Sequence, residues 1–338
     1  MSAWKIAAIA VAAALSAALP VAGQAQPAPD RPLRIDVAAS PIVSFDVNDR
    51  ARRRFGALEF RGGLILTSVE PRFGGLSSII MSPDGTGFLA ASDKGDWVRG
   101  RIAYRDGRPH ALQDVEVAPM LGPDGRPLAA RGWYDTEALA RDGEVVYAGI
   151  ERVNQIVRFD FTKGGLGARG VPMDLPPIMR TLPHNQGIEG LVHVPAGLPL
   201  AGALIALSER ALDAAGNIRG YLLGGPARGT FAVRRSDNFD ITDAALLPSR
   251  DLLILERRFT PATGPAVRIR RIALASIKPE ALVDGPVLME ADIAHEIDNM
   301  EGLGIHRAAD GATVLTLVSD NNFSPLQRTL LLQFTLLE

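Results

Sequence analysis

The stretch "NMEGLGIHRAADGATVLTLVSDNNF" (299–323) has the layout of one β-hairpin with an acid at each open end. Glu301 stands before the first apolar run, an Asp-Gly pair at 310–311 separates the two runs, and Asp320 follows the second run. Asp-Gly between two apolar runs is a strong signal for a tight turn. Because the start of one antiparallel strand lies beside the end of the next, we expect Glu301 and Asp320 to be neighbours.

The same layout recurs four times earlier in the chain: a short motif, an apolar run, a turn, a second apolar run and a charged end. These segments are 74–95, 135–154, 185–210 and 241–259. The anchor residues of the five repeats are Ser77, Glu137, Glu189, Asp243 and Glu301, spaced 52 to 60 residues apart. A further strand-like run follows each hairpin, so each repeat contains three or four strands.

Repeats of this size and strand content predict an all-β fold, a β-propeller of small sheets arranged radially. The radial arrangement buries sheet faces that would be exposed if each sheet stood alone. We favour six blades, with residues 33–70 either completing a sixth blade or closing the ring with the C-terminal strand, and five blades are the alternative. An irregular all-β sandwich is the competing interpretation. The sequence predicts a single domain over 33–338.

Residues 1–25 differ in composition from the rest of the chain. Lys5 precedes a short Ala-rich apolar stretch, and small residues lead into a polar, Pro-rich segment. This pattern predicts a secretory signal peptide cleaved after Ala25, with 26–32 as a flexible start of the mature chain. The apolar stretch is shorter than the roughly 20 residues of a membrane-spanning helix. We therefore expect a periplasmic or secreted protein with no membrane span after cleavage.

Composition and missing motifs exclude several chemistries. The chain has no cysteine, which rules out disulfides, Cys-bound metals and a thiol nucleophile. A formal net charge of −2 gives no support for a nucleic-acid-binding surface. The sequence lacks a G-x-S-x-G nucleophile elbow, a P-loop, a dinucleotide fingerprint and a zinc-type histidine pair. We expect a small-molecule ligand.

Radial packing would bring the hairpin acids to one end of the central channel, provided that each hairpin is the inner pair of its blade. Nine acids are then expected at this mouth: Asp93, Glu137, Glu151, Glu189, Glu209, Asp243, Glu256, Glu301 and Asp320. Converging carboxylates raise one another's pKa unless cations neutralise them. Two arrangements remain open: Glu–Arg pairs that join adjacent blades, and a hard cation such as Ca²⁺ bound by carboxylate and amide oxygens.

At the same segments the chain resembles the phytase-like domain family, also called the "esterase-like activity of phytase" family. The match is carried by "DTEAL" (135–139), "NQGIEGL" (185–191), "ITDAALL" (241–247), "NMEGL" (299–303) and "LVSDNNF" (317–323). It covers essentially all of 30–338 and includes the order of the motifs. The resemblance implies a β-propeller that hydrolyses phosphate or other esters.

The resemblance also implies site roles, because β-propeller phytases bind several Ca²⁺ ions at an acidic channel mouth. The metal-facing residues would be Glu137, Glu189, Asp243, Glu301 and Asp320. The anionic substrate would contact Lys94, Arg152, Arg210 and Arg257. Glu189 and Glu301 are the catalytic candidates, with His184 as a general acid or base just before the third repeat. Ser77 departs from the pattern, since it stands where the other repeats have an acid.

Two alternatives to a Ca²⁺-assisted esterase or phosphatase remain. One is a Ca²⁺-dependent lactonase, which would use the same kind of oxygen ligands for ring opening. The other is a non-catalytic periplasmic propeller whose mouth binds a metal or a small ligand. A weaker option is a propeller that serves as a protein-interaction platform.

Overall fold

The computed structural model describes residues 31–183 and 185–337. The predicted signal peptide (1–25) and most of the predicted flexible segment 26–32 lie outside the described residues, as does His184. No helix in the described part of the chain is long and apolar enough to cross a membrane.

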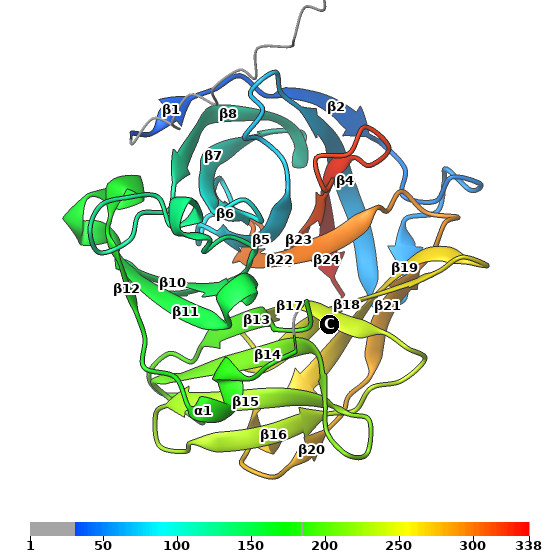
Figure 1. Cartoon of the computed structure of the whole chain (residues 1–338). Helices are drawn as coiled ribbons and strands as arrows, with labels where there is room; N and C mark the ends of the chain where they lie inside the picture. The colour runs from blue at the N-terminus through cyan, green and yellow to red at the C-terminus, as the bar shows by residue number, and fades with distance from the viewer. Residues whose placement is uncertain (1–30, 184, 338) are drawn as a thin grey trace, which may run out of the picture.

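Five sheets are arranged around a common centre (Figure 1), and each is one blade, described here from the inside outward. Blade 1 consists of β5 (Leu76–Met81), β6 (Gly87–Ser92), β7 (Asp96–Arg105), β8 (Arg108–Pro119) and β1 (Leu33–Arg34). Blade 2 consists of β9 (Thr136–Asp142), β10 (Val145–Ile150), β11 (Gln155–Asp160) and β12 (Gly170–Pro172). Blade 3 consists of β13 (Ile188–His193), β14 (Ala203–Leu212), β15 (Ile218–Gly224), β16 (Gly229–Val233) and β20 (Leu282–Val283).

Blade 4 consists of β17 (Asp240–Leu246), β18 (Asp251–Thr260), β19 (Gly264–Ala273) and β21 (Val287–Ala291). Blade 5 consists of β22 (Asn299–Arg307), β23 (Thr313–Asp320), β24 (Thr329–Leu336), β4 (Leu58–Thr67) and β2 (Ala38–Ile42), with β3 (Arg54–Phe55) beside β4. The connections hold a single short α-helix among the described residues, α1 (Pro177–Arg180). They also hold five 3-10 turns: Ala129–Arg131, Glu151–Val153, Phe161–Lys163, Gly165–Gly167 and Leu274–Ser276.

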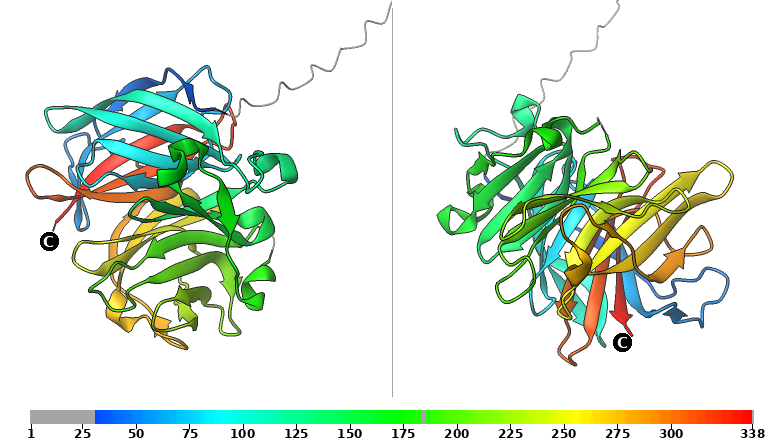
Figure 2. Two further views of the ribbon diagram at one scale, coloured as in Figure 1. Left: turned by 90° about the vertical axis from the view of Figure 1, so that its left-hand side faces the viewer. Right: turned by 90° about the horizontal axis from the view of Figure 1, so that it is seen from below.

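The ring is closed at its centre by the innermost strands. β5 lies beside β9, β9 beside β13, β13 beside β17, β17 beside β22, and β22 beside β5. Each predicted hairpin is therefore the inner pair of its blade, and Figure 2 shows the same ring from two further sides. This placement is what brings the motifs of distant repeats to one axis.

The structure has five blades rather than the six that the sequence favoured, which confirms the alternative. Residues 38–67 do not form a blade of their own, because β4 pairs with β24 and adds the outer strands of blade 5. The register places Leu64 opposite Leu331 and Gly63 opposite Leu332. The N-terminal part of the domain thus closes the ring against the C-terminal strand, as the sequence allowed.

Five apolar clusters fill the five interfaces between neighbouring blades. Leu255 of blade 4 and Leu317 of blade 5 share one cluster, and Leu207 of blade 3 and Ile254 of blade 4 share the next. The other three clusters join blade 5 to 1, blade 1 to 2, and blade 2 to 3. Removing these faces from water is the main favourable contribution that holds the ring together.

Candidate active site

A β-bulge lies near the start of each innermost strand, and in blades 2, 3 and 5 the bulge residue lines the cavity at the channel mouth. The strand register shifts around Ser77, Glu137, Glu189, Thr242 and Glu301 in blades 1 to 5. A bulge leaves one residue unpaired and re-aims its side chain. The leading residue of the repeated motif is therefore the bulge residue, and in three blades it is a glutamate.

The second strand of each hairpin ends beside this bulge. The Asp93 amide donates to the Gly75 carbonyl at 2.9 Å, and the Glu151 amide donates to the Asp135 carbonyl at 2.8 Å. The Glu209 amide is bonded in the same way to Gly187 at 2.8 Å. In blade 5, Asp320 lies opposite Asn299. The hairpins thus bring the trailing acids of blades 1, 2, 3 and 5 to the mouth beside the leading residues.

Blade 4 follows the pattern with a shift of one residue from the sequence prediction. Its bulge residue is Thr242 rather than Asp243, and the residue opposite Asp240 at the strand end is Arg257 rather than Glu256. The Arg257 guanidinium therefore lines the mouth where the sequence predicted a carboxylate, whereas Thr242 is fully buried and its hydroxyl donates to the Met300 carbonyl at 3.2 Å. Neither Asp243 nor Glu256 lines the cavity described below.

Asp243 lies one layer deeper, on the channel axis. Its carboxylate accepts hydrogen bonds from Ser78 Oγ at 3.1 Å and from the Leu303 amide at 2.8 Å. The side chain is 1% exposed, and burial raises its pKa well above the ordinary range. These bonds occupy the carboxylate that the family resemblance assigned to a metal.

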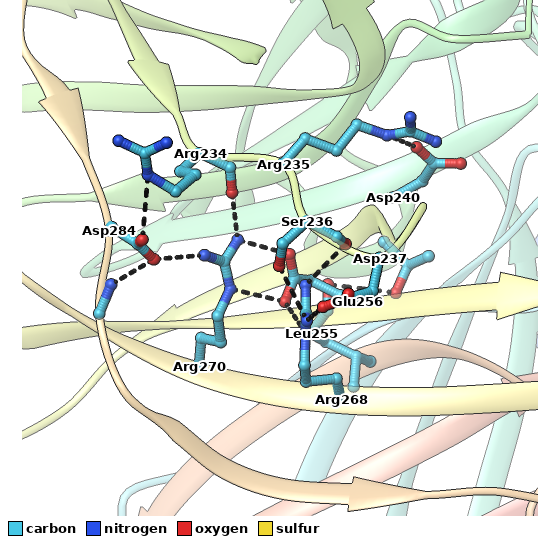
Figure 3. Close-up of polar contacts among 12 residues, drawn as sticks. Arg234, Arg235, Ser236, Asp237, Asp240, Leu255, Glu256, Arg268, Arg270 and Asp284 are labelled. Atoms are coloured by element: carbon cyan, nitrogen blue, oxygen red, sulfur yellow. Dashed lines mark hydrogen bonds and ion pairs between the residues drawn. The ribbon is translucent and has the colours of Figure 1, made fainter. Parts of the chain in front are cut away.

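Glu256 lies inside blade 4, between two buried arginines (Figure 3). Arg268 Nε and Arg270 Nε each donate to Glu256 Oε2 at 2.8 Å, and Arg270 also donates to Glu256 Oε1 at 2.6 Å. The two arginines continue to the 234–239 segment, where Arg270 donates to the Arg234 carbonyl at 2.9 Å. This cluster fastens the connection between blades 3 and 4 that carries Arg235 to the cavity wall.

The mouth is a cavity of about 1100 Å³. Seven hairpin carboxylates line it, from blades 1, 2, 3 and 5: Asp93, Glu137, Glu151, Glu189, Glu209, Glu301 and Asp320. Arg257 lies among them, with NH1 at 2.7 Å from Glu301 Oε1 and NH2 at 3.4 Å from Glu209 Oε1. Further out the cavity is lined by Arg210, Arg235 and Arg258.

Burial and mutual repulsion raise the pKa of these carboxyl groups. Burial, then the charges of other acids, raises the pKa values of Glu137 and Glu189 well above the usual range. The pKa of Asp93 rises to about 7, through burial and then Asp320. That of Glu301 rises to about 8, through burial, although Arg257 opposes the shift. The ten acids that line the cavity outnumber its four arginines, so ionised carboxylates would repel one another.

A family model matches most of the chain. The model named Phytase-like, described as "Esterase-like activity of phytase", matches residues 71–323, which are 253 of the 338 residues. The chain belongs to this family. The matched range begins before β5 and ends after β23, so it includes every hairpin that contributes a carboxylate to the mouth.

Other comparisons of this phytase-like chain say little about function. No curated protein matches it significantly. Among solved structures, it is similar to "Structure of U3-55K", with 9% identity, a TM-score of 0.40, and coverage of 78% of this chain and 96% of that one. It is also similar to "Crystal Structure of the N-terminal Domain of Nup159", with 12% identity, a TM-score of 0.36, and coverage of 87% and 99%. Likeness at this level carries no argument about the site.

The donor set of the mouth fits a hard divalent cation. One carboxylate oxygen from each of Glu151, Glu189 and Glu209 lies within 4.8 Å of the other two, and all three residues are buried. Oxygens from several carboxylates are the ligands that Ca²⁺ prefers. Glu189 was predicted as a metal ligand, whereas Glu151 and Glu209 were predicted only as acids of the mouth. Glu137, Glu301 and Asp320 line the same cavity.

The structure separates the four predicted substrate-binding cations into two pairs. Arg210 and Arg257 line the cavity, and Arg210 pairs with Asp240 at 3.4 Å. Lys94 Nζ instead lies 3.0 Å from the centre of the Phe323 ring, and the Arg152 guanidinium lies over the Tyr134 ring at 4.9 Å. Neither Lys94 nor Arg152 is among the lining residues. His184 lies outside the described residues, although its neighbour Asn185 lines the cavity.

Proposed function

We propose that this phytase-like propeller hydrolyses a phosphate or carboxylic ester at its acidic mouth with the help of Ca²⁺. The observation that carries the proposal is the set of ten carboxylates, seven of them from the hairpins, that line a single cavity with four arginines. Such a concentration of buried, mutually repelling acids destabilises the folded state. Its presence therefore supports a role in binding or chemistry. The family description supports ester hydrolysis as the reaction class.

Glu151, Glu189 and Glu209 would hold the ion, because their oxygens already converge. When bound, Ca²⁺ would supply positive charge that polarises the ester and offsets the negative charge developing during hydrolysis. The Gly187 amide donates to Glu151 Oε1 at 2.6 Å and so fixes the orientation of this carboxylate. Loss of any of the three glutamates should therefore weaken Ca²⁺ binding.

Glu301 is the candidate general acid or base. Its pKa of about 8 lets it hold or release a proton near neutral pH, which is what acid–base catalysis requires. Arg257 NH1 at 2.7 Å and Asn299 Nδ2 at 2.8 Å both donate to Oε1. No hydrogen bond within the described residues reaches Oε2, so this oxygen would be the one available to the ligand. The arginines that line the cavity, Arg257 and Arg210, would bind the anionic part of the substrate.

The test is hydrolysis of p-nitrophenyl phosphate, p-nitrophenyl acetate and a γ-lactone by the purified chain, with CaCl₂ or with EDTA. We expect turnover of at least one substrate with calcium and its loss with EDTA. Glu301→Gln should lower kcat/KM by about 10²- to 10⁴-fold. The matched control is Glu116→Gln, on the outer strand β8, which should leave the rate unchanged.

The same experiment decides between the alternatives. Turnover of the lactone alone would identify a lactonase. Tight calcium binding, measured by calorimetry, with no turnover of any substrate would contradict the enzymatic proposal and favour a metal- or ligand-binding propeller.

We also propose export, with cleavage after Ala25, from the composition of residues 1–25. Mass spectrometry of the chain recovered from the periplasm or medium of a bacterial expression host should show a mature protein that begins at Gln26. Recovery of the uncleaved chain in the cytoplasm would contradict this.

A further inference from the structure

The lining of the acidic cavity is chemically asymmetric. The lining residues that come from blades 1 to 3 are all charged or carry a side-chain amide. Every apolar lining residue comes from blades 4 and 5 or the connection between them: Phe259, Pro265, Ala266, Ile297 and Leu326. Charged residues thus surround the whole mouth, whereas apolar residues are confined to the side formed by blades 4 and 5.

Two of these apolar residues stand in solvent. Phe259 is 72% exposed and Leu326 is 91% exposed. Phe259 lies opposite Pro265 near the turn of the β18–β19 hairpin, which projects from the ring (yellow in Figure 2). Leu326 comes from the connection between β23 and β24. We call Phe259, Pro265 and Leu326 the apolar lip.

The apolar lip belongs to the same cavity as the carboxylates. Phe259 follows Arg257 by two residues on β18, so the strand that places a guanidinium among the acids also carries the exposed ring. Leu326 lies beyond Asp320 in blade 5, and both line the cavity. A ligand that fills this cavity therefore meets the buried carboxylates in its depth and the exposed apolar lip at its outer edge.

We propose that the mouth selects an amphiphilic ester, with its ester group over the carboxylates and an alkyl or aryl substituent against the apolar lip. The claim that the ligand is an ester rests on the proposed function. The claim that it has an apolar substituent rests on the apolar lip alone. Covering the lip removes apolar surface of both partners from water. Each buried methylene should tighten binding about three- to fourfold, which corresponds to about 0.8 kcal/mol.

The experiment measures binding of methylphosphonate, butylphosphonate and octylphosphonate to the mature chain by calorimetry, with CaCl₂ present. These probes share one anionic head and are not hydrolysed. We expect octylphosphonate to bind at least tenfold more tightly than methylphosphonate. In the double variant Phe259→Ser/Leu326→Ser the ratio should fall below threefold, with methylphosphonate affinity unchanged. The matched control is Val171→Ser, at an exposed apolar residue of β12 in blade 2.

Each outcome is decisive. Equal affinity for the three phosphonates, a chain-length preference that survives the double variant, or no binding of any phosphonate would overturn the inference. Lip-dependent sedimentation with phosphatidylcholine vesicles, without a preference for octylphosphonate in solution, would also overturn it and point to a membrane contact. An octyl preference in a chain that hydrolyses no ester would support the inference and contradict the proposed function.

Discussion

The Asp243 carboxylate of blade 4 accepts a hydrogen bond from the Ser78 hydroxyl of blade 1 at 3.1 Å, across the channel axis. The Ser78 oxygen in turn accepts from the Leu139 amide of blade 2 at 3.2 Å, and Asp243 also accepts from the Leu303 amide of blade 5 at 2.8 Å. Three blades therefore meet at one buried carboxylate, and the Ser78 hydroxyl links a fourth, blade 2, to it. None of these residues lines the acidic cavity, and Leu139 and Leu303 follow the bulge residues Glu137 and Glu301 by two positions.

We predict that Asp243→Ala lowers the free energy of unfolding by about 3–5 kcal/mol, because it leaves the Ser78 hydroxyl and two backbone amides buried without an acceptor. Urea denaturation followed by circular dichroism measures the loss. The control is Asp174→Ala, at a 96% exposed side chain paired with Arg180, which should change stability by less than about 0.5 kcal/mol. Equal effects of the two substitutions would contradict the role of Asp243.

Asp243 also shows how far the sequence specifies this site. Four repeats read acid or Ser, small, apolar at the bulge, after an apolar residue or, in blade 2, Thr136, as in Ile188-Glu189-Gly190-Leu191. Aligned by this pattern, Ile241-Thr242-Asp243-Ala244 places Thr242 with the acids and Asp243 with the small residues. Matching acid to acid moved the alignment by one residue, and a slip of one reverses the face of every side chain in a strand. The apolar positions of the motif therefore already indicate that Thr242, not Asp243, is the bulge residue.

Other features depend on contacts between distant parts of the chain, which no local sequence pattern predicts. The hairpins, their repeat and the meeting of acids at one axis follow from turn signals and apolar periodicity. The number of blades depends on whether β4 pairs with β24, which lies more than 260 residues away in the chain. The apolar lip depends on how far the β18–β19 hairpin extends beyond its neighbours.

We predict that calcium stabilises the protein much more at pH 8 than at pH 5. The pKa values of Asp93 and Glu151 rise to about 7 and that of Glu301 to about 8, all primarily through burial. A raised folded-state pKa gives stability that is present below about pH 4 and is lost as pH rises through 7 to 8. In EDTA, Tm should therefore fall over this window, and CaCl₂ should restore it at pH 8, where the carboxylates are ionised.

Thermal melts at pH 5 and pH 8, with EDTA or CaCl₂, measure this dependence. Glu189→Gln removes a ligand and should abolish most of the calcium effect at pH 8, whereas Glu116→Gln should preserve it. A calcium-induced rise in Tm of the same size at both pH values would be inconsistent with carboxylates as the ligands.

The Glu256 cluster predicts a large stability effect far from the substrate. Glu256→Ala leaves Arg268 and Arg270, each 2% exposed, without their shared carboxylate, and should cost about 3–5 kcal/mol of unfolding free energy. Asp251→Ala breaks a half-exposed pair with Arg271 on the same two strands and should cost less than about 1 kcal/mol. Urea denaturation of both variants compares them directly. A cost at Glu256 no greater than at Asp251 would show that the buried cluster contributes little.

The last prediction concerns His306, a buried residue of β22 on the interface between blades 5 and 1. Burial lowers its pKa to about 4, and its ring packs against the Gly85 turn of blade 1, where any Cβ would come within 2.1 Å of the ring. A neutral histidine with a lowered folded-state pKa stabilises the protein above about pH 6.5, and this contribution is lost as pH falls to about 4, because the unfolded chain takes up the proton first. Between pH 6.5 and pH 4, the wild type should therefore lose this contribution to its free energy of unfolding. Because glutamine does not titrate, the loss should be about 1–2 kcal/mol smaller in His306→Gln than in the wild type, after allowance for solvent screening. The carboxylates of the mouth contribute equally to both proteins and cancel in this difference. Urea denaturation across the pH range measures this difference, with His110→Gln on β8 as the matched control. Parallel pH profiles for the wild type and His306→Gln would rule out a neutral buried imidazole at this interface.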